Sequence, residues 1–147
     1  MKKQNRNLFA GVVLFSAAFA LLYSCSEEKS TPKDESSENE FIKSIRNTSQ
    51  FDSLLNSSGR RLLVFDLYAD WCGPCKILDP ILKDVAEQQA QKASFYKVDV
   101  DKHPQIAQSL EVRGIPYVVF VKDREVVHTI TGVQPRNAYL EAVEKHQ

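Results

Sequence analysis

The chain has 147 residues, enough for one domain with a hydrophobic core of its own. Its 19 basic and 19 acidic residues cancel, but Lys2, Lys3 and Arg6 all precede residue 25, and the remainder has 16 basic against 19 acidic residues. Domains that bind nucleic acid usually present a basic patch. We therefore expect no nucleic acid among the partners of this chain.

Residues 1–24 have the three parts of an export signal. A cationic start is followed by an uncharged, largely apolar run from Leu8 to Tyr23 and then by the small residue Ser24. This pattern is typical of a signal peptide that is removed from the mature protein. The alternative is a retained membrane helix, although the run is slightly shorter than the roughly 20 residues that a membrane span needs.

The sequence LLYSC, which ends at Cys25, resembles the lipobox of bacterial lipoproteins, with Tyr23 bulkier than the residue usual there. In that family the signal is cut before the cysteine, which carries lipid on its sulfur. Each buried CH₂ of an acyl chain contributes roughly 0.8 kcal/mol, so two or three chains hold a small domain at a bilayer. The resemblance implies an extracytoplasmic protein, lipid-anchored to a bacterial membrane, and Ser26 favours the outer membrane. The alternative is that Cys25 carries no lipid and is a cysteine that occurs by chance in the apolar signal.

Residues 25–40 are predicted to be the lipidated cysteine and a disordered tether. The part from Ser26 to Glu40 has no hydrophobic residue and is rich in Ser, Glu and Lys. A segment of this composition cannot bury a core. A flexible chain of about 15 residues reaches roughly 20 Å, which would lift the remaining segment, the predicted domain 41–147, clear of lipid headgroups.

Strand and helix patterns alternate through the predicted domain. In chain order they are a strand at 41–45, a helix at 48–58 capped by Thr48 or Ser49, a strand at 61–69, a helix from Cys75 to about Gln91, a strand at 94–100, a helix at 103–110, two strands within 115–132 joined at Asp123-Arg124, and a helix at 136–146. The near-continuous apolar run at 61–69 is typical of a strand buried on both faces. This order predicts an α/β fold with a central mixed β-sheet and helices on both faces.

Only Gly73 and Pro74 separate Cys72 from Cys75, in the string WCGPCK. Three interpretations of the pair are open: half of a metal site, a structural disulfide, or a redox pair. A zinc site usually needs four ligands, but the sequence has no second CxxC, and its three histidines are scattered singly. A structural disulfide here would close a very small loop, and small loops stabilise least. These arguments disfavour the first two interpretations.

The redox interpretation has a physical basis in the position of the pair at the start of a helix. The first sulfur would lie beside free backbone N–H groups and the positive end of the helix dipole. Both favour the thiolate, which is the nucleophile in disulfide exchange. The second sulfur would lie one turn into the helix, positioned to attack a mixed disulfide.

The segment DLYADWCGPCKILDPIL resembles the active-site segment of thioredoxins, and the similarity extends from about Phe41 to the C-terminus. The resemblance implies the thioredoxin fold, with Cys72 as the attacking nucleophile and Cys75 as the resolving cysteine. Asp66 matches the family's buried carboxylate, a general acid/base for the proton of Cys75, and Lys97 matches the lysine that tunes this carboxylate. A base is needed because burial raises the pKa of a thiol and slows its attack.

The resemblance also implies a groove for client proteins. The string RGIPY resembles the family's Gly-Ile-Pro loop, in which the proline is cis, so Pro116 would face Cys72 and the backbone of Ile115 would pair with an extended client chain. From the residues alone, a trans proline at the start of a strand stays open. The other substrate-binding residues that the resemblance implies are Trp71, Gly73, Pro74 and Gly132.

Some positions depart from the thioredoxin pattern. Leu67 and Tyr68 stand where phenylalanine and tryptophan are frequent, and Tyr117 stands where threonine usually follows the cis-proline. Because Tyr117 borders the groove, the choice of clients is expected to differ. Arg124 stands in a hairpin turn where glycine is common, and it is strained if the turn requires a positive φ.

The direction of electron flow is predicted from the two residues between the cysteines. Gly73-Pro74 matches the reducing thioredoxin type, so we expect a protein-disulfide reductase that needs no cofactor or metal. A reductase outside the cytoplasm has to be recharged, which predicts a membrane thiol-electron donor as a partner besides the disulfide-containing clients. The alternatives are a thiol oxidase or isomerase and a redox-inert adaptor. No feature predicts an oligomer, so we expect a monomer.

Overall fold

The computed structural model describes residues 41–57 and 59–147. The predicted signal peptide, the predicted tether and the predicted lipid site at Cys25 lie outside the described residues. Within those residues, no helix combines the length and the apolar character that crossing a membrane requires.

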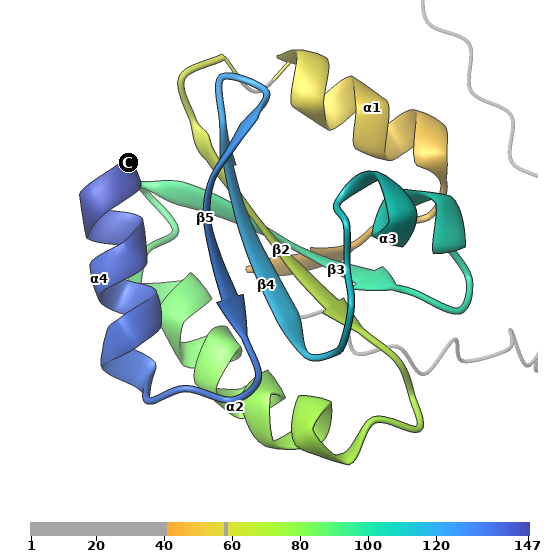
Figure 1. Ribbon diagram of the computed structural model, residues 1–147. Helices are drawn as coiled ribbons and strands as arrows, with labels where there is room; N and C mark the ends of the chain where they lie inside the picture. Colours follow the sequence, from red (N-terminus) through yellow and green to blue (C-terminus); the bar gives the residue numbers. More distant parts are fainter. Residues whose placement is uncertain (1–40, 58) are drawn as a thin grey trace, which may run out of the picture. The chain divides into compact units, whose positions relative to one another are not determined.

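Five strands form one mixed sheet in the order β1-β3-β2-β4-β5 (Figure 1). The strands are β1 (Ile42–Ser44), β2 (Leu62–Tyr68), β3 (Ala93–Asp99), β4 (Tyr117–Lys122) and β5 (Glu125–Thr131). β1, β3 and β2 run parallel, β4 is antiparallel to β2, and β5 is antiparallel to β4. The carboxyl ends of β2 and β3 therefore meet at one edge of the sheet, together with the start of β4.

In the described part of the chain, four helices cover the sheet. They are α1 (Thr48–Ser57), α2 (Gly73–Gln88), α3 (Pro104–Ser109) and α4 (Arg136–His146). α2 and α4 pack on one face, and α1 and α3 pack on the other (Figure 1). The predicted α/β fold, a mixed sheet with helices on both faces, is confirmed.

Strand β2 is the centre of the sheet and is buried along nearly its whole length. Because side chains alternate between the faces of a strand, Leu62 and Val64 belong to the core under α2 and α4, whereas Leu63 and Phe65 belong to the core under α1 and α3. Asp66 continues the series of Leu62 and Val64. The sequence register thus places this carboxylate on the face that α2 covers.

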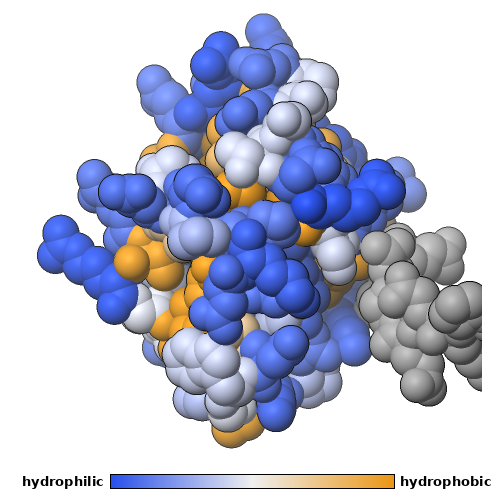
Figure 2. Space-filling view, turned by 90° about the vertical axis from the view of Figure 1, so that its right-hand side faces the viewer, coloured by the Kyte–Doolittle hydropathy of each residue, from blue (hydrophilic) through white to orange (hydrophobic). Residues whose placement is uncertain are grey.

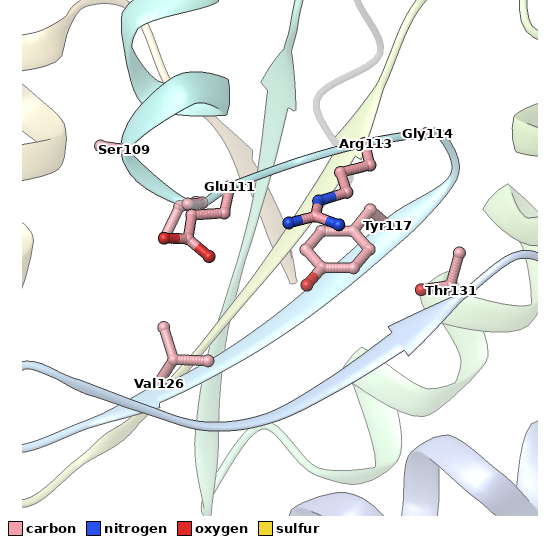
Figure 3. A pocket seen from close by; sticks show the side chains of 8 residues that line it. Ser109, Glu111, Arg113, Gly114, Tyr117, Val126 and Thr131 are labelled. Atoms are coloured by element: carbon pink, nitrogen blue, oxygen red, sulfur yellow. The ribbon is translucent and has the colours of Figure 1, made fainter.

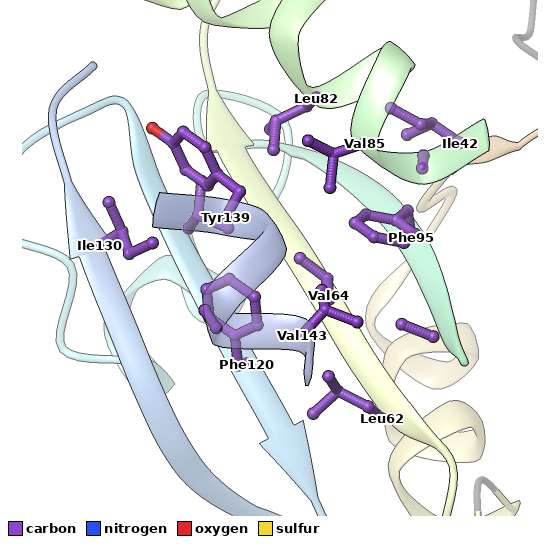
Figure 4. Close-up of a cluster of buried hydrophobic side chains, with 14 of the residues drawn as sticks. Ile42, Leu62, Val64, Leu82, Val85, Phe95, Phe120, Ile130, Tyr139 and Val143 are labelled. Carbon is purple, nitrogen blue, oxygen red and sulfur yellow. The ribbon is translucent and has the colours of Figure 1, made fainter. Parts of the chain in front are cut away.

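The core under α2 and α4 is drawn in Figure 4. Burying each large apolar side chain in such a cluster contributes about 1.5–3 kcal/mol. Its largest side chain, Tyr139, is fully buried, and its hydroxyl accepts the N–H of Gln134 at 3.0 Å and donates to the carbonyl of Gly132 at 3.3 Å. Tyr139 thereby ties α4 to the segment that follows β5.

The cap of one helix and the start of another differ from the sequence prediction. α1 begins at Thr48, and Asn47 caps it, because the side-chain oxygen of Asn47 accepts the N–H of Gln50 at 2.8 Å. The predicted caps, Thr48 and Ser49, are wrong because asparagine is an equally good cap and stands one residue earlier. α2 begins at Gly73 rather than Cys75, since the sulfur of Cys72 serves as its cap.

The β4–β5 hairpin turns at Asp123 and Arg124, which have φ of 51° and 70°. The turn therefore requires the left-handed region at both residues, as type I′ hairpins do. Neither residue is glycine, and the left-handed conformation costs a residue with a side chain roughly 1–2 kcal/mol. The strain expected at Arg124 is present.

Candidate active site

The end of β2 and the start of α2 position the cysteine pair. Cys72 has an extended backbone, with φ −76° and ψ 103°, and caps α2, while Cys75 lies in the first turn. Pro74 fits this turn because the first N–H groups of a helix have no partner within the helix. The sulfurs of Cys72 and Cys75 are joined in a disulfide.

The backbone at the start of α2 is arranged to stabilise negative charge on the first sulfur. The N–H of Cys75 donates to Sγ of Cys72 at 3.2 Å. The helix dipole adds positive potential at the same end. When the disulfide is reduced, both effects favour the thiolate form of Cys72, which is the nucleophile in disulfide exchange.

Asp66 lies buried beneath α2, with only 4% of its surface exposed. Burial raises the pKa of its carboxyl to about 7; the charge of Lys97 lowers this pKa, and that of Asp79 raises it. Its Oδ1 atom has no hydrogen-bond partner among the described residues. A buried carboxyl without a partner is costly and, beside a reactive pair, is a candidate for proton transfer.

Lys97 lies directly opposite Asp66 in the register of β3 and β2. Its ammonium donates to Oδ1 of Asp79 on α2 and lies 4.5 Å above the ring centre of Tyr68. The structure thus brings Lys97 to Asp66, as the sequence predicted, but gives its hydrogen bond to Asp79. Asp79 was not among the site residues predicted from the sequence.

The Ile115–Pro116 peptide bond is cis. Ile115 packs against the cluster that contains Cys72 and Cys75. The carbonyl of Pro116 accepts the N–H of Gly132 at 2.8 Å, and Gly132 has a φ of 72°, which favours glycine. The structure brings these loop residues together beside the pair, and their binding of a client chain stays a prediction.

Trp71 is held at the edge of the site, although 70% of its surface is exposed. Its indole N–H donates to Oδ2 of Asp101 at 2.8 Å, and the N–H of Asp101 donates to Oδ1 of Asp99 at 3.0 Å. Asp99 and Asp101 were missed in the sequence. Their position in the sequence could have identified them, since polar residues at the carboxyl ends of neighbouring parallel strands gather at one edge of the sheet.

The tip of the site is open to solvent. Gly73 and Pro74 are both exposed, and a Cβ atom added at Gly73 would meet no atom within 4 Å. Trp71 and Ile77 are large apolar side chains exposed at the same end of α2. The face in Figure 2 has apolar areas that are small and separated by polar ones.

Two hollows adjoin these residues. The first, of about 240 Å³, is lined by Cys75, Asp79 and Lys97, together with Tyr68, Ala69, Asp70 and Lys76. The second, of about 530 Å³, lies beyond the cis-proline loop and is lined by Arg113, Tyr117 and Thr131, among others (Figure 3). Tyr117, which departs from the thioredoxin pattern, therefore lines a hollow beside the loop.

The arrangement has the parts that thiol–disulfide exchange needs. It combines a sulfur at a helix start, a second sulfur within bonding distance, and a buried carboxyl with a pKa of about 7. Within residues 41–57 and 59–147, no group of three or more His, Cys, Asp or Glu side chains is placed to hold a metal ion.

Comparison with known proteins places this geometry in a family. The sequence profile of the thioredoxin family matches residues 42–145. Thioredoxin from Staphylococcus saprophyticus is 39% identical over 98 residues, which are 67% of this chain and 91% of the relative.

Among solved structures, thioredoxin from Malassezia sympodialis has a TM-score of 0.66 and 34% identity, with 71% of this chain and 90% of that chain covered. Thioredoxin NaTrxh from Nicotiana alata has a TM-score of 0.69 and 26% identity, with 73% and 93% covered. The similarity therefore spans the sheet, the helices and the cysteine pair.

Proposed function

The chain belongs to the thioredoxin family and is a protein disulfide oxidoreductase with Cys72 and Cys75 as its redox pair, and from this premise we propose that it is a reductase working outside the cytoplasm. The direction of electron flow, from this protein to its clients, is inferred from the Gly73-Pro74 dipeptide between the cysteines, at the open start of α2. The location outside the cytoplasm is inferred from the lipobox-like string that ends at Cys25. Lipid on Cys25 would anchor the protein, as a monomer, to a bacterial membrane.

The first chemical step is attack by the reduced protein on a client disulfide. The Cys72 thiolate forms a bond to one client sulfur, the client S–S bond breaks, and the other client sulfur leaves as a thiolate. The product is a mixed disulfide between Cys72 and the client. The cis-proline loop beside Cys72, with Ile115 packed against the pair, would align the client chain for this attack.

The second step releases the client. Asp66 takes the proton from the Cys75 thiol, and the new thiolate attacks Sγ of Cys72. The bond from Cys72 to the client breaks, the second client sulfur leaves as a thiolate, and the Cys72–Cys75 disulfide forms. Two electrons have passed to the client. A pKa of about 7 for Asp66 suits this role, because a base works best with a pKa near the operating pH.

The protein then needs two electrons to begin again. Outside the cytoplasm the environment is oxidising, so disulfides form and persist there. The proposed source is a membrane thiol-electron donor, whose own dithiol attacks the Cys72–Cys75 disulfide by the same two steps in reverse. If oxidised protein accepts no electrons from membranes that contain such a donor, this part of the proposal fails.

Trapping of clients tests the reductase chemistry. In the Cys75→Ser variant, the first step proceeds and the second is blocked, so clients should accumulate as mixed disulfides that dithiothreitol releases. The Cys72→Ser variant is the matched control and should trap nothing. Insulin reduction driven by dithiothreitol should be fast with the unmodified protein and fall to the uncatalysed rate with Cys72→Ser. Equal rates for both proteins would instead indicate a redox-inert adaptor.

Lipid labelling tests the location. Cells given radiolabelled palmitate should incorporate it into the unmodified protein, which should fractionate with membranes. The Cys25→Ser variant should carry no label. A Cys25→Ser protein that is labelled and membrane-bound to the same extent would refute the lipid anchor while leaving the redox chemistry intact.

A further inference from the structure

Asp79 is a carboxylate of the site with no role in the steps above. It lies on α2, one turn after Cys75, with its side chain 24% exposed. Both of its oxygens are engaged: Oδ1 accepts from Lys97, and Oδ2 accepts from Lys83 at 2.8 Å. Asp79 thus joins α2 to β3 through an ion pair.

Asp66 and Asp79 compete for one ammonium group. Lys97 stands directly opposite Asp66 in the strand register, so the two side chains emerge on the same face of the sheet. The hydrogen bond of Lys97 nevertheless goes to Asp79, and Oδ1 of Asp66 has no partner in the described part of the chain. Lys97 is therefore paired with Asp79, while the carboxyl of Asp66 has no ion-pair partner among those residues.

Few other ionisable groups act on Asp66. Tyr68 on its own strand and Tyr139 on α4 interact with it, and burial raises the pKa of both hydroxyls further above 10, so both are neutral near pH 7. β4 places the apolar Val118 opposite Asp66. Besides burial, which has the largest effect on the pKa of Asp66, the charges that act on it are those of Lys97 and Asp79, and they act in opposite directions.

We propose that Asp79 is a positioning residue that binds Lys97 and so keeps the carboxyl of Asp66 unpaired, as a proton acceptor for Cys75. The part that concerns Cys75 rests on the proposed function. Asp79, Lys97 and Cys75 line the same hollow of about 240 Å³, so the ion pair adjoins both the resolving cysteine and solvent. If Lys97 paired with Asp66 instead, the carboxylate would be stabilised and would be a weaker base.

The direct test is titration of Asp66 by carbon-13 NMR in the full chain with its disulfide intact. In Asp79→Asn, the repulsion from Asp79 is lost and Lys97 is released. The pKa of Asp66 should therefore fall from about 7 by about one unit or more. Asp79→Glu, which keeps the charge, should restore the original titration.

A matched control is available on the same helix. Asp84 also lies on α2 and also forms an ion pair, with Arg136. Asp84→Asn should leave the titration of Asp66 unchanged. A second variant, Lys97→Gln, should raise the pKa of Asp66, and this opposite shift tests the electrostatics even if Asp79→Asn folds poorly.

The kinetic readout is the reaction of the reduced protein with Ellman's reagent in a stopped-flow instrument. The first thionitrobenzoate released reports attack by Cys72, and the second reports attack by Cys75 on the mixed disulfide. In Asp79→Asn, the acid limb of the second phase should move to lower pH by the same amount as the NMR titration. At pH 6 the rate of this phase should rise, because more Asp66 is ionised there. Above pH 8, where Asp66 is ionised in both proteins, the rate should fall, because the carboxylate of the variant is the weaker base.

The outcomes are separable. An Asp66 pKa that stays near 7 in Asp79→Asn, or moves equally in Asp84→Asn, would overturn the inference. An Asp66 pKa that falls while the second kinetic phase keeps its pH profile would support the positioning of Lys97 by Asp79. The unchanged pH profile would at the same time refute Asp66 as the base for Cys75, which is part of the proposed function.

Discussion

Strand β2 has a charged side chain just before its first residue, Arg61, and another near its last, Asp66, and their surroundings differ. The guanidinium of Arg61 donates four hydrogen bonds to the segment between α2 and β3 and to the start of β3. Its acceptors are Oγ of Ser94 at 2.7 Å and the carbonyls of Gln91 at 3.0 Å, Ala90 at 2.5 Å and Ala93 at 2.8 Å. Asp66, by contrast, is buried with one oxygen unpaired.

The difference separates groups that hold the fold from groups that perform chemistry. A polar group that makes most of its hydrogen bonds contributes to stability and has little tendency to react. A buried carboxyl that lacks a partner lowers stability when it is ionised, but it can exchange a proton near neutral pH. The amino end of β2 is therefore the structural end, and its carboxyl end is the reactive end.

Asp66→Asn should give the largest effect on stability. The pKa of Asp66 is about 7 in the folded protein against 3.8 when unfolded. Between these values the folded protein keeps a proton that the unfolded chain loses, so its free energy of unfolding should fall as pH rises from about 4 to about 7. A shift of this size corresponds to about 4 kcal/mol.

The variant should therefore be more stable than the unmodified protein at pH 8, by up to that amount, and nearly equal to it at pH 4. Urea denaturation of the oxidised proteins at the two pH values measures this difference. An Asp66→Asn variant that is destabilised equally at both pH values would show that the carboxyl of Asp66 is not a source of pH-dependent strain.

Arg61→Ala should give a smaller effect of the opposite sign. The side chain is exposed, so water replaces part of what its four hydrogen bonds supply, and a loss of about 1–2 kcal/mol is expected. The reduction potential and the insulin assay should not change. Denaturation and activity measured on the same sample check this, and a changed potential would contradict the separation between the two ends of β2.

Arg124→Gly should give the smallest effect. The turn that contains Arg124 lies at the same end of the sheet as Arg61, since Val121 pairs with Leu63. Glycine adopts the φ of 70° without strain, so a gain of about 1 kcal/mol in the free energy of unfolding is expected. Lys122→Gly, with no positive φ to relieve, is a control that should lose stability.

Most of the fold could be predicted from the sequence because each element has a strong local signal. The central strand β2 appears as an apolar run too short for a helix, and Pro104 marks the start of α3. The element bounds were predicted less well. Three good cap residues follow one another at 47–49, so local preference could not choose among them.

The site could be predicted in part. The cysteine pair, Asp66 and Pro116 lie in strings that resemble one family closely. Asp79 could not be identified, because an acid within a helix has no distinctive local pattern, and Asp101 was missed although its position after β3 is a signal. Their roles follow from which element packs over which, since Asp79 meets Lys97 only when α2 covers β3.

The reduction potential of the Cys72–Cys75 pair is the most direct test of the central claim that this oxidoreductase is a reductase. The purified protein would be equilibrated in dithiothreitol redox buffers, and the fraction of disulfide would be measured after acid quenching. We predict a value near −270 mV, which is characteristic of thioredoxins. A value near −120 mV, as in strong periplasmic oxidants, would contradict the proposed direction and identify a thiol oxidase.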